Sequence, residues 1–173
     1  ENFISSNRYP LIITLGFFLV FAYITFFHHN YWWSDVDGVF YLQKGAQVLN
    51  GDGFNVHVND APVGGAVLYS LVGSFLDDGF LAMKLIALLS CTGIVFVSFY
   101  IIRNIFSFKV ALVGQLIVAF TPRLELNAIL SMNEMLPVFL TFMSLFLITK
   151  KHTNLRYLIL ISILLGSAVM IRY

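Results

Sequence analysis

Two carboxylates, Asp35 and Asp37, directly follow the first apolar segment of the chain, in the stretch WWSDVDGVFYLQKGAQVL. A carboxylate whose pKa is raised by low-dielectric surroundings can act as a general base or bind a metal ion. The simpler interpretation is that Asp37 caps a helix and Asp35 is a solvated loop charge. Spacing alone leaves both interpretations open.

Glu134 is a second candidate, because it interrupts an otherwise apolar run from residue 126 to 149. A carboxylate in such a run is costly in lipid, so we expect it to face a cavity or a cation. A purely structural ion pair with Arg123 or Arg172 is the alternative. Glu125 lies in a short connector and is expected to be exposed.

Three cations, Lys84, Arg123 and Arg172, are expected near one membrane interface. Anchoring to lipid headgroups is the ordinary role of such residues. Together with the acids they could instead hold a phosphate, which a guanidinium group suits well. The glycines in GDG and VGG are interpreted as turn residues, and they do not form a phosphate loop.

The composition indicates which solvent surrounds these residues. Hydrophobic residues make up 59% of the 173 residues and charged residues 11%, whereas soluble domains carry about 25% charge. A soluble fold of this length cannot bury so much apolar surface, so we expect an integral membrane protein. The net charge of +1 argues against a nucleic-acid partner.

Apolar runs of near-spanning length predict an all-α, polytopic transmembrane bundle with about five spans, since a span needs about 20 residues. The predicted spans cover residues 10–27, 85–102 (starting near Phe80), 105–122, 126–149 (kinked or widened at Pro137) and 157–171. We expect one domain over residues 1–173. Because the chain lacks an initial methionine and stops within an apolar run, we expect it to be the amino-terminal part of a longer protein.

A long external loop is predicted between the first two spans, at residues 30–79. Val39, Leu42, Ala46 and Leu49 recur at helical spacing, which indicates an amphipathic interfacial helix that starts at an Asp37 N-cap and stops near Gly51. The stretch AVLYSLVGSFL is too short to span and is expected to be a second interfacial or re-entrant helix.

The distribution of charge predicts the orientation. With a cytoplasmic N-terminus, the inner side carries mostly bases, and the outer side collects every acid after Glu1 together with four cations. The outer acids are Asp35, Asp37, Asp52, Asp60, Asp77, Asp78, Glu125 and Glu134. The candidate residues would therefore share the periplasmic or extracellular face, or the ER lumen in a eukaryote.

Several stretches in the same order resemble the GT-C superfamily, whose members are polytopic glycosyltransferases that use lipid-linked sugars. The similarity is closest to protein mannosyltransferases and aminoarabinose transferases. SDVDGVFYLQKGAQVLNGDGF resembles their first external loop, and APVGGAVLYSLVGSFL resembles their juxtamembrane helix. FLAMKLIALLSCTGIVFVSFYIIRNIF is similar to their second helix, which carries Lys84 here. AFTPRLELNAILSMNEMLPVFLTFMSLFLI resembles the segment with a second acid, Glu134, and LLGSAVMIRY ends in a basic–aromatic pair.

The resemblance implies transfer of a sugar from a polyprenyl- or dolichyl-phosphate carrier in the membrane lipid to an acceptor protein, lipid or glycan outside the cytoplasm. It implies that Asp37 or Asp35 takes the acceptor proton, that Glu134 orients a cation or the sugar, and that the three cations stabilise the leaving phosphate. Some relatives use a divalent metal, for which Asp35 and Asp37 are the candidate ligands, and the sequence does not decide this point.

Two other function classes stay open. The acids are separated by Val36, and basic residues usual in the superfamily are missing at Asp60–Ala61 and Ala128–Ile129, which fits a catalytically inactive structural subunit. A transporter subunit is the other alternative, although transporters place polar residues near the bilayer midplane, often in inverted repeats.

Overall fold

The computed structural model describes residues 8–28, 36–51, 63–130, 134–150 and 154–172. Within these ranges all regular structure is helical, which confirms the expected all-α class. The elements are α2 (Arg8–Tyr23), the π-helical turn η1 (Ile24–His28), α3 (Val36–Leu49), α4 (Val63–Leu76), α5 (Gly79–Ile105), α6 (Phe108–Ala119), α7 (Pro122–Ile129), α8 (Met135–Thr149) and α9 (Leu155–Arg172).

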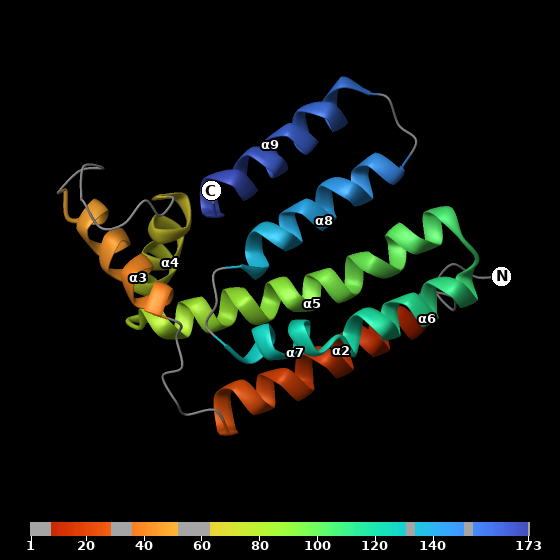
Figure 1. Ribbon diagram of the computed structural model, residues 1–173, viewed down its shortest axis with the longest axis horizontal. Helices are drawn as coiled ribbons and strands as arrows, with labels where there is room; N and C mark the ends of the chain where they lie inside the picture. Colours follow the sequence, from red (N-terminus) through yellow and green to blue (C-terminus); the bar gives the residue numbers. More distant parts are fainter. Residues whose placement is uncertain (1–7, 29–35, 52–62, 131–133, 151–153, 173) are drawn as a thin grey trace.

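Helix α5 is the central element of the bundle (Figure 1). It packs against α8 on one side and against α2, α6 and α7 on the other, while α9 packs on α8. Helices α3 and α4 pair with each other at one end of the bundle, where α9 also ends. The main hydrophobic core lies between α2, α5, α7 and the start of α8, and it contains Phe17, Leu88, Cys91, Val95 and Ala128.

Three helical segments in the described residues are long and apolar enough to cross a membrane: Arg8–His28, Gly79–Ile105 and Leu155–Arg172. They correspond to the first, second and fifth predicted spans. The second begins at Gly79 because Asp78 caps it, accepting hydrogen bonds from the amides of Phe80 (2.9 Å) and Leu81 (3.1 Å).

The third and fourth predicted spans have different boundaries in the structure. Helix α6 ends at Ala119, and the expected continuous helix over residues 126–149 is wrong, because α7 ends at Ile129 and α8 begins only at Met135. Pro137 therefore lies in the first turn of α8, where a proline costs no hydrogen bond, and it kinks nothing. With 12 and 15 residues, α6 and α8 are shorter than a full span.

Helix α3 confirms the predicted amphipathic helix but corrects its start. It begins at Val36, so Asp37 lies inside the first turn and does not precede it as an N-cap. Its end agrees with the prediction, since Leu49 is the last helical residue and Gly51 has a φ of 94°. Helix α4 starts at Val63, so Gly64 and Gly65 are helical residues and not turn glycines.

Candidate active site

The alternating direction of the helices separates the described charges between the two ends of the bundle. The C-terminus of η1, the N-termini of α5 and α8 and the C-terminus of α9 all lie at the end that carries α3 and α4 (Figure 1). At the opposite end the described residues carry only bases, which are Arg8, Arg103, Lys109, Lys150 and Arg156. The acids of the described segments thus gather toward one side, with several cations beside them.

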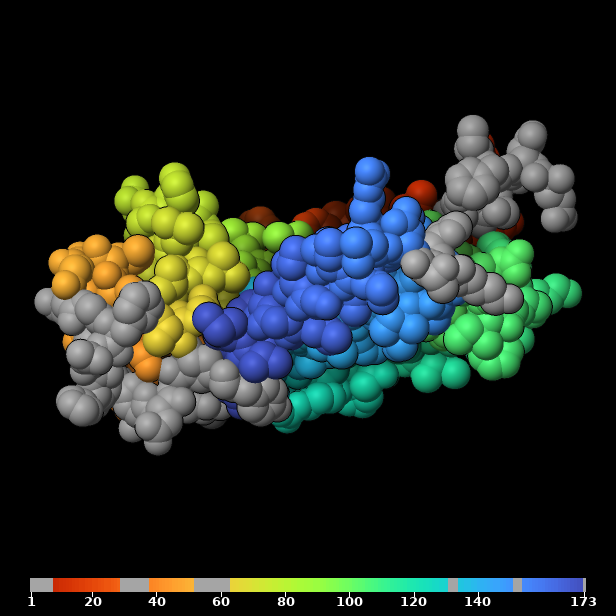
Figure 2. Space-filling view, turned by 90° about the horizontal axis from the view of Figure 1, so that it is seen from above, coloured from red at the N-terminus to blue at the C-terminus, as the bar shows by residue number. Residues whose placement is uncertain are grey.

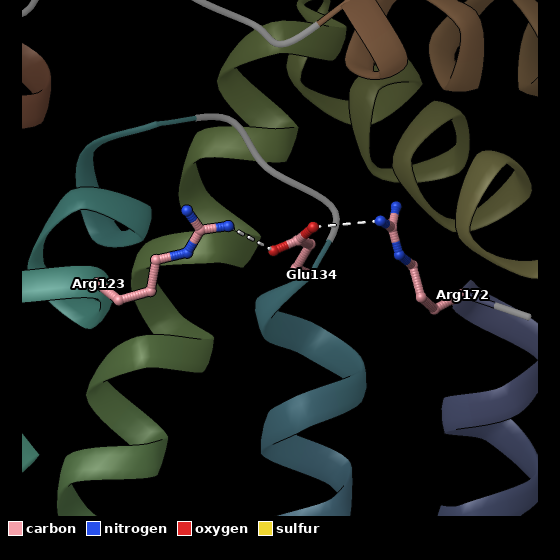
Figure 3. Close-up of polar contacts among 3 residues, drawn as sticks. All are labelled: Arg123, Glu134 and Arg172. Carbon is pink, nitrogen blue, oxygen red and sulfur yellow. Dashed lines mark hydrogen bonds and ion pairs between the residues drawn. The ribbon is translucent and has the colours of Figure 1, made fainter.

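Glu134 lies at the centre of an ionic cluster formed by three separate elements (Figure 3). Its Oε2 accepts a hydrogen bond from Nη2 of Arg123 at 3.3 Å, and its Oε1 accepts one from Nη2 of Arg172 at 3.1 Å. Arg123 comes from α7, Glu134 immediately precedes α8, and Arg172 ends α9. Both cations proposed as alternative partners from the sequence therefore bind the same carboxylate.

This cluster of Arg123, Glu134 and Arg172 carries a net positive charge, because two guanidinium groups share one carboxylate. Each arginine makes one hydrogen bond to Glu134 and keeps further N–H donors, since a guanidinium has five. The side chains are partly exposed, and such ion pairs add only about 0.2–1 kcal/mol each to stability. The cluster is therefore better suited to binding an anion than to holding the fold together.

An apolar groove of about 690 Å³ between α8 and α9 opens at this cluster. Glu134 and Arg172 line its polar end, and the remaining lining residues are Pro137, Val138, Thr141, Phe142, Leu165, Ala168 and Val169. The Thr141 hydroxyl donates to the carbonyl of Pro137 at 2.9 Å, so it is satisfied within its own helix. A charged end on an apolar body matches an amphiphile with an anionic head.

Comparison with known proteins decides the family. The family described as dolichyl-phosphate-mannose-protein mannosyltransferase matches residues 60–173. The chain belongs to this family. It is a GT-C family, so the resemblance seen in the sequence is confirmed. Searches of curated proteins and of solved structures gave no match.

Membership of this family indicates the general class of activity. The mannosyltransferase family consists of membrane glycosyltransferases that use dolichyl- or polyprenyl-phosphate sugars. Its apolar helices make this chain an integral membrane protein. The matched region contains the cluster of Arg123, Glu134 and Arg172 and begins after Asp35 and Asp37.

The positions of the Asp35 and Asp37 carboxylates relative to the cluster are not part of the described structure. Asp35 lies outside the described residues, and Asp37 is described only as a backbone position in the first turn of α3. Lys84 is half-buried in the first turns of α5 and does not belong to the arginine–glutamate cluster. Among the described residues, no group of three His, Cys, Asp or Glu side chains could hold a metal ion.

Glu125 differs from its sequence-based expectation. It is half-buried and lines a second apolar groove, of about 310 Å³, between α2 and α6. The sequence analysis divided α7 between a connector and a span. This helix carries both Glu125, which lines the second groove, and Arg123, which binds Glu134.

Tyr69 is the residue near this site that the sequence analysis missed. It is fully buried in α4 and makes an edge-on ring contact with Tyr41 of α3, with ring centroids 6.5 Å apart. Burial and the neighbouring Tyr41 raise the pKa of the Tyr69 phenol, and the positive charge of Arg172 opposes part of that rise. The α3–α4 pair therefore reaches the arginine at the end of α9, and no local sequence pattern signals this contact.

Proposed function

We propose that this protein transfers a sugar from a polyprenyl- or dolichyl-phosphate carrier to an acceptor on the non-cytoplasmic side of the membrane. The observation that carries the proposal is the cluster of Arg123, Glu134 and Arg172 at the open end of an apolar groove. A lipid-phosphate sugar needs both features side by side, because its chain is insoluble in water and its phosphate is insoluble in lipid.

The donor would lie with its first isoprene units between α8 and α9 and its phosphate against Arg172 and Arg123. Fork-shaped guanidinium groups bind phosphate oxygens through charge-assisted hydrogen bonds. Each guanidinium uses one N–H donor for Glu134, and the further donors of each group would bind the phosphate oxygens. Lys84 would add a third positive charge from the start of α5.

The transfer step forms one bond and breaks another at the anomeric carbon of the sugar. The acceptor oxygen attacks that carbon while the bond to the carrier phosphate breaks, and the phosphate leaves with the electron pair. Asp37 or Asp35 takes the proton of the acceptor hydroxyl as general base. The cations stabilise the negative charge that develops on the leaving phosphate.

A transporter is the weaker alternative for this site. Transporters hold their ions near the bilayer midplane. Glu134 immediately precedes α8 and Arg172 is the last residue of α9, so the cluster sits where helices end.

The test is sugar transfer by the full-length protein after Asp37→Asn and Asp35→Asn. At least one substitution should lower transfer by about 100-fold or more, because general-base catalysis contributes about 10²–10⁴-fold. Asp77→Asn is the matched control, since Asp77 is exposed with a φ of 54°, a conformation that Asn tolerates, and transfer should be unchanged. Full transfer by both variants would leave the aspartates without a catalytic role. No transfer by the parent protein itself would favour the inactive structural subunit.

A further inference from the structure

The first turn of α4 rests directly on the backbone of the last turn of α9. A Cβ atom added at Gly64 would lie 2.5 Å from the carbonyl oxygen of Met170, and one added at Gly65 would lie 2.9 Å from that of Ile171. Real Cβ atoms do not approach so closely, and a helix carbonyl cannot swing aside as the end of a side chain can. Figure 2 shows α4, in yellow, against the end of α9, in dark blue.

This contact lies beside one of the phosphate-binding candidates. Met170 and Ile171 immediately precede Arg172, whose side chain reaches Glu134 at 3.1 Å. Any shift of α4 away from α9 would change what supports the backbone from which Arg172 extends. Tyr69 lies about one turn further along α4, toward α5, where the charge of Arg172 opposes part of the rise in the pKa of its phenol.

The same unit includes the helix that carries Asp37. Gly45 of α3 packs without a side chain against Ala66 and Ser70 of α4. The Ser70 hydroxyl also donates a hydrogen bond to the carbonyl of Leu42 at 3.3 Å. Close glycine contacts thus join α3 to α4 and α4 to the end of α9 in one packed series.

We propose that Gly64 and Gly65 are positioning residues for Arg172. By allowing α4 to rest on the α9 backbone, they set the location of the guanidinium relative to Glu134 and to the donor phosphate. The functional consequence rests on the proposed glycosyltransferase activity, whereas the positioning itself can be measured without it.

The first experiment is a double-mutant cycle on the thermal unfolding of the full-length protein in detergent. Glu134→Gln should lower the unfolding temperature by about 2–4 °C in the parent, because both ion pairs are weakened. In a Gly65→Ala background the same change should cost less than half as much, since Arg172 is already displaced. Gly65 is preferred to Gly64 because its 2.9 Å contact is the less severe of the two.

The matched control is Gly166→Ala, in the helix α9 on which α4 rests. A Cβ added at Gly166 meets no atom within 4 Å, so it tests the change from glycine to alanine without the clash. The Glu134→Gln effect should be the same in this background as in the parent. An equally large Glu134→Gln effect in the Gly65→Ala background would overturn the proposal.

The second experiment separates positioning from a general loss of folded protein. Gly65→Ala should raise the KM for the lipid-phosphate sugar by about fivefold or more and leave the KM for the acceptor unchanged, while Gly166→Ala changes neither. A KM does not depend on how much protein folds, so a lower yield of the variant does not obscure the result. An unchanged donor KM would overturn the role in donor binding.

Binding of farnesyl phosphate to the parent protein distinguishes the two proposals. Binding that Gly65→Ala weakens and Gly166→Ala does not would support both. Absence of binding to the parent would count against the proposed function, and the double-mutant cycle would still decide whether the glycines position Arg172.

Discussion

Glu134 accepts a hydrogen bond on each carboxylate oxygen, and the two donors differ in their surroundings. The Arg123 side chain is 64% exposed, whereas the Arg172 side chain is 29% exposed and lines the apolar groove. Water and salt screen a charge more strongly when it is exposed. The two arginines should therefore contribute unequally to binding of an anionic lipid headgroup.

Substitution of the two arginines should show this inequality. Arg172→Gln should raise the donor KM by about tenfold or more, which corresponds to about 1.4 kcal/mol of lost binding. Arg123→Gln should raise it by about threefold or less, because its charge is better solvated. Steady-state kinetics with a lipid-phosphate sugar would measure both values. A larger effect at Arg123 would place the phosphate on the α7 side of Glu134 and outside the α8–α9 groove.

At the scale of elements, close contacts at glycine determine how the helices pack. The Phe139 ring of α8 lies against Gly93 of α5, and Ile102 of α5 lies against Gly114 of α6. Two hydrogen bonds also join α2 to α6. The Gln115 side-chain amide donates to the Pro10 carbonyl and to the Thr14 hydroxyl, each at 3.0 Å. Small residues at such interfaces allow close van der Waals packing in lipid, where the hydrophobic effect between helices is absent.

Gly93→Leu should separate α5 from α8 and lower the unfolding temperature by about 3–8 °C, since overpacking costs about 1–3 kcal/mol. Gly166→Leu is the control, because nothing lies within 4 Å of the added Cβ, and it should shift the temperature by less than about 2 °C. Thermal unfolding followed by circular dichroism would check both. Equal shifts in the two variants would mean that the Gly93–Phe139 contact does not limit the packing of α5 on α8.

At the scale of the whole molecule, the separation of charge predicts how the protein lies in the membrane. The described residues at the end opposite α3 and α4 include bases and no acid, which is typical of a cytoplasmic side. The α3–α4 end should therefore face outward, together with the cluster of Arg123, Glu134 and Arg172.

Cysteine labelling in intact cells would test this orientation. Ser74→Cys, exposed near the end of α4, should react with a membrane-impermeant maleimide added outside. Ser107→Cys, exposed between α5 and α6, should react only after the membrane is permeabilised. The natural Cys91 is buried and should stay silent. The reverse pattern would invert the proposed orientation.

Much of this arrangement was predictable because hydropathy is a local property. The apolar runs correctly predicted membrane helices at Arg8–His28, Gly79–Ile105 and Leu155–Arg172, and helix-ending glycine chemistry located the end of α3. The cost of an unpaired carboxylate in lipid also predicted that Glu134 would face a cation. The break between α7 and α8 was missed, because the apolar run continues through it and composition does not mark where packing divides a helix.

The sequence by itself indicated the lipid environment, the all-α class and the family resemblance. It also predicted that the Glu134 carboxylate would face a cavity or a cation. Only the tertiary structure decided that Arg123 and Arg172, from α7 and α9, share that one carboxylate, and that Gly64 and Gly65 support the second of them. The physical reason is that apolar patterning acts within each helix, whereas the meeting of distant side chains depends on how closely backbones approach. At Gly64 and Gly65 the absence of a Cβ atom allows the backbones of α4 and α9 to come this close.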